Sequence, residues 1–142
     1  MENNYDVIIL GAGASGMTAA LAVYENGLSV GLFEKQNLVG GTAGVSGGII
    51  WAPMNSHMKD KGIKDERSMA IDYFMSLSNG EIDPIRLESF IDNCSSAIDF
   101  IEEKTDANFY VLDGYPDYYL DRPGAILGGG RALDNKPVSY TH

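Results

Sequence analysis

The spacing of apolar residues near the N-terminus predicts a strand, a helix and a second strand. Val7 to Leu10 form an unbroken apolar run, as expected for a parallel strand that is buried on both faces, and we place this strand at residues 6–10. A helix follows and ends at about residue 26, with an apolar face at helical spacing. That face is formed by Met17, Ala20, Leu21 and Tyr24. Residues 29–33 form the second strand, so the pattern predicts a βαβ unit of the α/β class.

Beyond the second strand, the pattern predicts mostly helix and loop. Residues 65–79 read as a helix with Asp65 as its N-cap, and residues 83–104 as another that starts at Asp83 and Pro84. Asn93 or Ser95 would be the place for a break in this second helix, and propensity alone does not decide. Acidic residues opposite the apolar stripe indicate a solvated face rather than paired catalytic carboxylates. A short strand is expected at residues 108–112.

The turn between the first strand and the helix carries the pattern Gly-x-Gly-x-x-Gly. Gly11 permits a tight exit from the strand, Gly13 lets the backbone approach a pyrophosphate, and Gly16 lets the helix pack closely. The free N–H groups at the helix start favour a diphosphate. Glu34 closes the second strand, at a spacing that places a carboxylate on a ribose hydroxyl. We therefore expect a Rossmann-like dinucleotide site, and the carboxylate disfavours the 2′-phosphate of NADP.

A second glycine-rich loop spans residues 38–48. A flexible linker is the plain alternative, but linkers are rarely followed by an apolar segment such as Ile49-Ile50-Trp51. The loop is therefore expected to lie along a cofactor, with backbone amides and the hydroxyls of Thr42 and Ser46 as donors.

Composition narrows the class of protein further. The chain has 142 residues, of which 44% are hydrophobic and 21% charged, and its net charge is −10. These values indicate a globular protein and disfavour a nucleic-acid partner, which would require a basic surface. The lone Cys94 forms no intrachain disulfide and no metal pair, so we expect a buried thiol and no metal site. Without a leader pattern or an apolar run of membrane length, a soluble cytoplasmic protein is expected.

These motifs together resemble the fumarate reductase and 3-ketosteroid dehydrogenase flavoprotein superfamily. The resemblance rests on the glycine turn, on Glu34-Lys35, on the segments 40–42 and 46–48, and on Trp51 with Pro53. It implies FAD as the cofactor, with Glu34 on the adenosine ribose and the second loop beside pyrophosphate and flavin. The residues that it assigns to the cofactor are Gly11, Gly13, Ala14, Ser15, Gly16, Glu34, Lys35, Gly41, Thr42, Ala43, Ser46, Gly47 and Gly48.

The resemblance also bears on how the flavin is held. Some members of the superfamily carry a covalent histidine in the second loop, at a position that corresponds to Gly41 here, so non-covalent FAD is expected. His57 follows that loop; we expect it at the surface and assign it no chemistry.

Residues 114–119, Gly-Tyr-Pro-Asp-Tyr-Tyr, would by composition be a loop fixed by aromatic packing. With Gly129-Gly130-Arg131 and Lys136-Pro137, however, they resemble the 3-ketosteroid Δ1-dehydrogenase branch. That resemblance implies that Tyr118, or else Tyr119, assists a proton-abstracting tyrosine located much later in such chains. The implied reaction removes a proton from C2 and a hydride from C1 of a steroid-like ketone, passing the hydride to flavin N5 and then to an electron acceptor.

Two other functions remain open from the sequence: a fumarate- or enoate-reductase-like flavoprotein, and a non-catalytic nucleotide-binding module. Arg122 and Arg131 do not decide for or against the reductase, whereas the Tyr118 loop favours the steroid-like branch. The chain is expected to be the N-terminal portion of one FAD-binding domain. Residues 1–52 would form the βαβ unit and flavin loop, and residues 53–142 a helical segment and active-site loop. Alone, it is expected to bind FAD weakly or not at all and not to turn over, and residues 138–142 are not expected to form a C-terminal helix.

Overall fold

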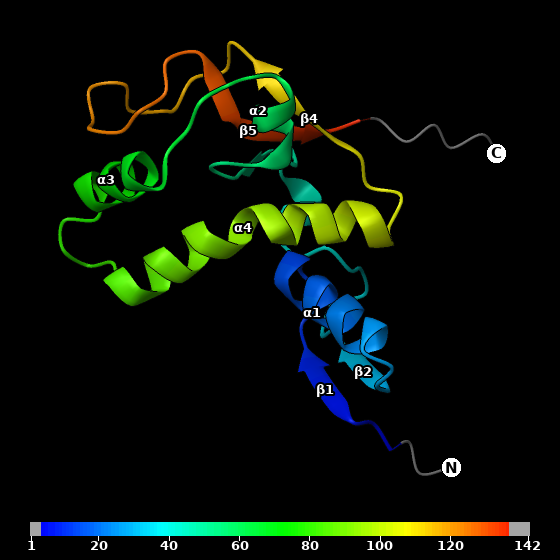
Figure 1. Ribbon diagram of the computed structural model, residues 1–142. Helices are drawn as coiled ribbons and strands as arrows, with labels where there is room; N and C mark the ends of the chain where they lie inside the picture. The colour runs from blue at the N-terminus through cyan, green and yellow to red at the C-terminus, as the bar shows by residue number, and fades with distance from the viewer. Residues whose placement is uncertain (1–3, 137–142) are drawn as a thin grey trace. The chain divides into compact units, whose positions relative to one another are not determined.

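The computed structural model describes residues 4–136, and the chain divides into two compact units, residues 1–48 and 49–142. The first unit holds β1 (Val7–Leu10), α1 (Ala14–Glu25), β2 (Val30–Phe33) and the 3₁₀ turn η1 (Ala43–Val45) (Figure 1). β1 and β2 are parallel neighbours, and α1 is the crossover between them. The predicted α/β class and βαβ unit are therefore confirmed, with each element within two residues of its predicted bounds.

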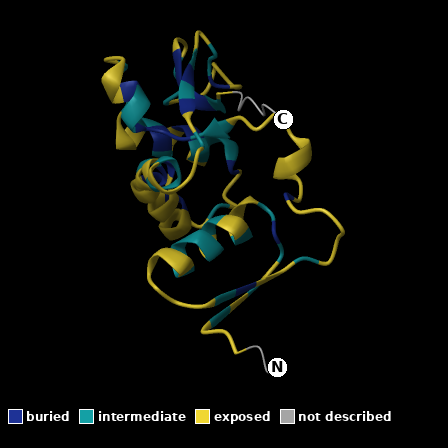
Figure 2. Cartoon of the chain, turned by 90° about the vertical axis from the view of Figure 1, so that its right-hand side faces the viewer, coloured by how far each residue is buried: buried dark blue, intermediate teal, exposed yellow. Residues whose placement is uncertain are grey.

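The strands of the first unit are covered on one face only. Helix α1 packs on both strands, and Val7 and Ile9 are half-buried beneath it. The side chains that alternate to the other face stay exposed: Ile8 is 61% and Leu10 82% exposed. The prediction of a strand buried on both faces is thus wrong for these residues, because the unit supplies a single covering helix. Figure 2 shows mostly exposed and intermediate residues along this part of the chain.

The second unit is built on an antiparallel sheet that the sequence largely concealed. Its elements are β3 (Ile50–Trp51), α2 (Ser56–Asp60), α3 (Arg67–Leu77), α4 (Pro84–Lys104), β4 (Phe109–Asp113) and β5 (Gly129–Asn135). The strand order is β3-β5-β4, with β5 in the centre. Only β4 was predicted, at nearly the observed bounds, so the expectation of helix and loop beyond Glu34 is corrected. β5 has the sequence GGRALDN, whose glycines, Asp134 and Asn135 have low strand propensity; pairing on both sides makes it a strand.

The apolar core lies almost entirely in this second unit. One cluster joins Met58 of α2, Cys94 and Ile98 of α4, and the sheet residues Val111 and Leu133. A second cluster packs α3 on the first half of α4 through Ala70, Leu87 and Ile91, with Trp51 and Phe74 at its margin. α4 therefore connects the sheet with α3 along its length (Figure 1). Cys94 is buried, as predicted.

The predicted N-cap is wrong for α3 and confirmed for α4. The cap position of α3 belongs to Glu66, not Asp65, and no side chain caps this end. The Asp65 carboxylate lies instead on Arg131, a partner that is distant in sequence. At α4, the Asp83 side chain accepts a bond from the Ile85 N–H and Pro84 occupies the first turn, as predicted.

α4 is a single helix without a break at Asn93 or Ser95. Its stripe is narrower than the sequence suggested, because Phe90 and Ala97 are exposed. The acidic face forms ion pairs and hydrogen bonds rather than a carboxylate dyad: Glu88 and Asp92 bind Arg67, and Asp99 binds the Ser56 hydroxyl.

His57 differs from its predicted surface position. Its imidazole is partly buried, and its Nε2 lies 2.8 Å from a carboxylate oxygen of Glu102. Within residues 4–136, no helix is both long and apolar enough to cross a membrane. Pro137 and residues 138–142, which figured in the sequence-based predictions, lie outside the residues that the structure describes.

Candidate functional site

The glycine turn is tight because of two close backbone approaches. Gly11 has φ +100°, the left-handed region that favours glycine. Its N–H donates to the Phe33 carbonyl oxygen over 2.7 Å, which connects the turn to the end of β2. A Cβ at Gly16 would overlap the Gly11 carbonyl oxygen. Gly16 is therefore required for α1 to start where it does.

At the start of α1, backbone N–H groups of the first turn lack a side-chain cap and face open space. The first intrahelical bond runs from the Met17 N–H to the Gly13 carbonyl oxygen, over 3.0 Å. The N–H groups of Ala14, Ser15 and Gly16 precede that bond and have no partner inside the helix. No side chain caps this end, and a Cβ at Gly13 would meet nothing within 4 Å. Exposed amides at the positive end of a helix dipole fit a diphosphate.

Glu34 lies beside the turn and has a defined orientation. One carboxylate oxygen accepts from the Ala12 N–H over 2.7 Å, and the other from the Gln36 N–H over 2.9 Å. These bonds, the one from Ala12 foremost, lower the pKa of Glu34 below its ordinary value. The side chain is therefore an anion near neutral pH. A carboxylate accepts about four hydrogen bonds, so lone pairs remain for ribose hydroxyls.

The second glycine loop returns to the first. The Gly40 N–H donates to the Ala12 carbonyl oxygen over 2.8 Å, and Gly40 pairs with Gly13 as a short parallel bridge. Gly41 has φ +54°, and a Cβ there would lie 3.3 Å from the Gly13 Cα. The structure therefore brings the two glycine motifs into contact, which sequence spacing alone did not require.

The rest of the loop is exposed. Thr42 precedes η1 without forming a side-chain cap, and Ala43 begins that turn. The Ser46 hydroxyl donates to the Ala43 carbonyl oxygen over 2.9 Å and accepts from the Gly48 N–H over 3.1 Å. In this conformation Ser46 already has internal partners, whereas the predicted cofactor contact would need its hydroxyl to turn.

A cavity of about 680 Å³ adjoins these motifs. Its lining residues are Leu10, Gly11, Phe33, Glu34, Lys35, Gln36 and Gly41. It thus combines apolar walls from both strand ends with the Glu34 carboxylate, which suits a flat base and its sugar. Of the predicted cofactor residues, Gly11, Glu34, Lys35 and Gly41 line it. The others do not: Gly13, Ala14, Ser15, Gly16, Thr42, Ala43, Ser46, Gly47 and Gly48.

In the second unit, the tyrosine-rich loop presents its side chains to solvent. Tyr118 is 78% exposed, and its hydroxyl lies 3.4 Å from that of Tyr115, with the rings edge to face. This contact with Tyr118 raises the pKa of the Tyr115 hydroxyl. Tyr119 is also exposed, and its N–H donates to the Tyr73 hydroxyl over 3.2 Å. The edge-to-face contact between Tyr115 and Tyr118 is aromatic packing of the kind predicted for this loop, and hydrogen bonds hold its backbone as well.

A buried polar cluster supports this loop, and it was not among the features predicted from sequence. Arg131 is 1% exposed and binds the carboxylates of Asp65 and Asp117, while Asp117 also binds Trp51. The available signal was weak: a single arginine within the short segment GGRAL, between residues that pack inside. Among residues 4–136, no group of His, Cys, Asp or Glu side chains could hold a metal ion.

A parallel pair of strands with a glycine turn, a bare helix start and a terminal glutamate defines a dinucleotide-binding βαβ unit. Comparison with known proteins gives its family. Residues 6–132 match the family described as FAD binding domain, and the chain belongs to this family. FAD is therefore the cofactor for which these residues are suited.

Individual relatives are dehydrogenases. The chain is 37% identical over 128 residues to 4-oxocyclohexanecarboxylate 2-dehydrogenase of Sinomonas cyclohexanicum, covering 90% of this chain and 22% of that protein. It is 34% identical over 135 residues to 3-oxosteroid 1-dehydrogenase of Mycobacterium tuberculosis, covering 95% of this chain and 24% of that protein. The chain thus spans about a quarter of the length of these relatives.

Among solved structures, 3-ketosteroid Δ1-dehydrogenase of Sterolibacterium denitrificans superimposes with a TM-score of 0.85 at 36% identity. The match covers 93% of this chain and 23% of that one. A flavocytochrome c3 fumarate reductase matches with a TM-score of 0.73 at 21% identity, covering 96% of this chain and 22% of that one. The second likeness concerns the fold alone.

Proposed function

We propose that this chain forms the FAD-binding and tyrosine-loop part of a dehydrogenase that introduces a double bond beside a ring ketone. One observation carries the proposal. The likeness to a 3-ketosteroid Δ1-dehydrogenase extends over 93% of the chain at 36% identity, so it includes both the glycine motifs and the tyrosine loop. The likeness to a fumarate reductase is weaker, at 21% identity.

In this proposal the first unit holds the ADP half of FAD. The amides of Ala14 and Ser15 face the pyrophosphate, and Gly13 leaves room for it to approach. Glu34, kept ionised by its backbone donors, accepts from the ribose hydroxyls. Residues 41–48, with Thr42 and Ser46, line the remainder of the dinucleotide, and no residue of this chain forms a covalent bond to it. Bound FAD supplies a hydride acceptor at N5.

The second unit supplies a proton relay. A tyrosine has an ordinary pKa of about 10, so a tyrosine base near neutral pH needs a hydrogen-bonded neighbour that stabilises its anion. Tyr118 is suited to that role because its hydroxyl is exposed and already has a hydroxyl partner in Tyr115. Tyr119 is the second choice, since it is exposed but only its N–H has a partner. The base itself lies outside this chain.

The proposed substrate is a steroid-like ketone. The relatives named above are dehydrogenases of oxo compounds, one of a steroid and one of a smaller oxocyclohexane acid. Proton loss beside the ketone and hydride loss from the next carbon together form the carbon–carbon double bond. An electron acceptor then takes the electrons, and neither nucleic acid nor a membrane is a proposed partner.

The test uses the full-length protein loaded with FAD under anaerobic conditions. A 3-oxosteroid should bleach the visible flavin band, and Tyr118→Phe should slow this by about 10²-fold. The matched control is Tyr110→Phe, whose hydroxyl binds Asp134 on the neighbouring strand and faces no proposed substrate; it should bleach at the wild-type rate.

Other outcomes would contradict the proposal in distinct ways. Bleaching by 4-oxocyclohexanecarboxylate but not by steroid would replace the substrate class. Reoxidation of reduced flavin by fumarate, without any bleaching by oxo compounds, would indicate a reductase. Bound FAD that responds to none of these compounds would leave a non-catalytic binding module.

A further inference from the structure

The tyrosine loop, residues 115–126, rests on a buried charge. The Arg131 guanidinium donates to an oxygen of Asp117 over 2.8 Å and to both oxygens of Asp65 over 2.8 and 2.6 Å. All three side chains are nearly inaccessible: Arg131 and Asp65 are 1% exposed, and Asp117 is 3% exposed. Because a buried charge is tolerated only when it is paired, this arrangement leaves each group few alternative positions.

Asp117 immediately precedes Tyr118, and its carboxylate accepts from three donors. Besides Arg131, its carboxylate accepts from the Trp51 indole N–H over 2.7 Å and from the Ile126 N–H over 2.9 Å. Its own N–H donates to the Ile126 carbonyl oxygen over 3.1 Å. These bonds close the loop at its base and connect it to β3.

The residue after Tyr118 is held as well. The Tyr119 N–H donates to the Tyr73 hydroxyl, and Tyr73 stacks on Trp51 with ring centroids 6.0 Å apart. The guanidinium of Arg131 lies 5.1 Å from the Trp51 ring and 5.8 Å from the Tyr73 ring. The backbone is therefore fixed on both sides of Tyr118, although the Tyr118 side chain itself is exposed.

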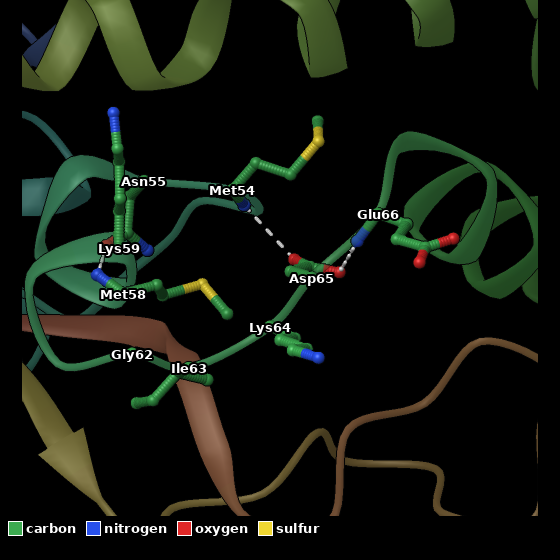
Figure 3. A pocket seen from close by; sticks show the side chains of 9 residues that line it. All are labelled: Met54, Asn55, Met58, Lys59, Gly62, Ile63, Lys64, Asp65 and Glu66. Carbon is green, nitrogen blue, oxygen red and sulfur yellow. Dashed lines mark hydrogen bonds between the residues drawn. The ribbon is translucent and has the colours of Figure 1, made fainter.

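Arg131 fixes a second segment through Asp65. That carboxylate also accepts from the N–H groups of Met54 and Glu66, as Figure 3 shows in the pocket that these residues line. Met54 has φ +51°, an uncommon conformation for a residue with a side chain. The Arg131 guanidinium thus holds two segments in place. One is the strained turn at Met54, which follows Trp51, and the other is the tyrosine loop.

We infer that Asp117 and Arg131 are positioning residues, which hold the hydroxyl of Tyr118 at the place where it serves the reaction. The inference rests on the proposed role of Tyr118. Both side chains are buried, so neither is accessible to a substrate. A lysine in place of Arg131 would not serve, since it lacks the planar fork that donates to both oxygens of Asp65 and also to Asp117.

The first experiment tests the loop without any substrate. Chymotrypsin cleaves after Tyr118, Tyr119 and Leu120, all exposed, only when the backbone there opens. In Asp117→Asn, the side-chain amide nitrogen is itself a donor and would face an N–H group that the carboxylate oxygen accepted from. The loop should then open more often, so we expect cleavage at these bonds to accelerate by about tenfold or more. Asp113→Asn is the matched control: Asp113 is an exposed carboxylate paired with Lys61, and its loss should leave the cleavage rate unchanged.

A second variant keeps this test valid if Asp117→Asn unfolds below the assay temperature. Trp51→Phe removes one donor to Asp117 and leaves the charged side chains of Asp117 and Arg131 in place. Cleavage at the loop should then rise by about threefold to tenfold, without new cleavage elsewhere. Loop cleavage at the wild-type rate in the folded variants would overturn the inference.

The second experiment distinguishes positioning from general support. Asp117→Asn should lower kcat by about tenfold or more in the wild-type background. In a Tyr118→Phe background it should lower kcat by less than about twofold, because the hydroxyl it positions is already gone. Equal losses in both backgrounds would overturn the inference. If no oxo compound is turned over, the proposed function fails, and the cleavage experiment still decides whether Asp117 holds the loop.

Discussion

Different interactions stabilise each of the two units of the chain. In the first, backbone bonds and glycines determine the arrangement, and α1 has no buried residue. In the second, Met58, Ile91, Val111 and Leu133 are fully buried, and so is Arg131. The comparison teaches that a cofactor-binding turn can be specified by local geometry, whereas the tyrosine loop depends on a core assembled from distant segments.

The largest expected effect comes from removing the buried cation of the second unit. Arg131→Met leaves two carboxylates buried without their partner and should lower the free energy of unfolding by about 3–5 kcal/mol. Fluorescence of Trp51, the single tryptophan of the chain, measures this in urea. Arg122→Met, at an exposed arginine, is the control and should change little. A loss below about 1 kcal/mol would show that the charges are not jointly buried.

A matched pair of leucine truncations sharpens the comparison. Leu133 is 0% exposed, so Leu133→Ala should cost about 2–5 kcal/mol of unfolding free energy. Leu10 lies on the uncovered face of β1 at 82% exposed, so Leu10→Ala should cost within about 0.5 kcal/mol. Amide hydrogen exchange reports on each unit separately. Similar losses at both sites would mean that the exposed face of β1 is covered in solution.

Two glycines of the first unit separate folding from binding. A Cβ at Gly16 would overlap the Gly11 carbonyl, so Gly16→Ala should destabilise the first unit by roughly 1–3 kcal/mol. A Cβ at Gly13 meets open space, so Gly13→Ala should keep the fold and weaken FAD binding by about tenfold or more, since it blocks the pyrophosphate. Circular dichroism and flavin fluorescence titration measure the two effects. Full FAD affinity in Gly13→Ala would remove the proposed cofactor position.

The smallest effect concerns pH. Since backbone donors lower the pKa of Glu34, its contribution to the stability of the first unit is fully present above its ordinary value of 4.5. That contribution is lost as the pH falls below 4.5 and through the lower pKa of the folded state. Amide exchange of β1 and β2 should therefore accelerate in this acidic window, beyond its intrinsic pH dependence. Hydrogen bonds from Ser29 lower the pKa of Asp6 as well, so part of this acceleration belongs to Asp6. Glu34→Gln, which does not titrate, should therefore show a smaller step than the wild type; a step of unchanged size would contradict the contribution of Glu34.

Much of the first unit could be predicted from sequence because its signals are local. The apolar run, the glycine turn and Glu34 each act within a few residues, and the observed elements follow them. The contact of Gly40 and Gly41 with Gly13 was not predictable, since it depends on the path that the loop takes back to the turn.

In the second unit, helices α3 and α4 and strand β4 could be predicted, whereas α2, β3 and β5 could not. Asp83 and Pro84 mark the start of α4 through local capping chemistry, which the structure confirms. Asp65 carries the same local signal, yet a distant arginine recruits it instead. Strand β5 has little intrinsic preference for its conformation, so its neighbours impose it.

The α/β class, the βαβ unit and the FAD-binding motif could be read from the amino-acid sequence, because these depend on residue type and short spacing. The meeting of Arg131, Asp65 and Asp117 in the interior beneath Tyr118 became visible only in the folded chain. The physical reason is that buried charges must pair, and a pairing between residues 65, 117 and 131 exists only once the chain has folded.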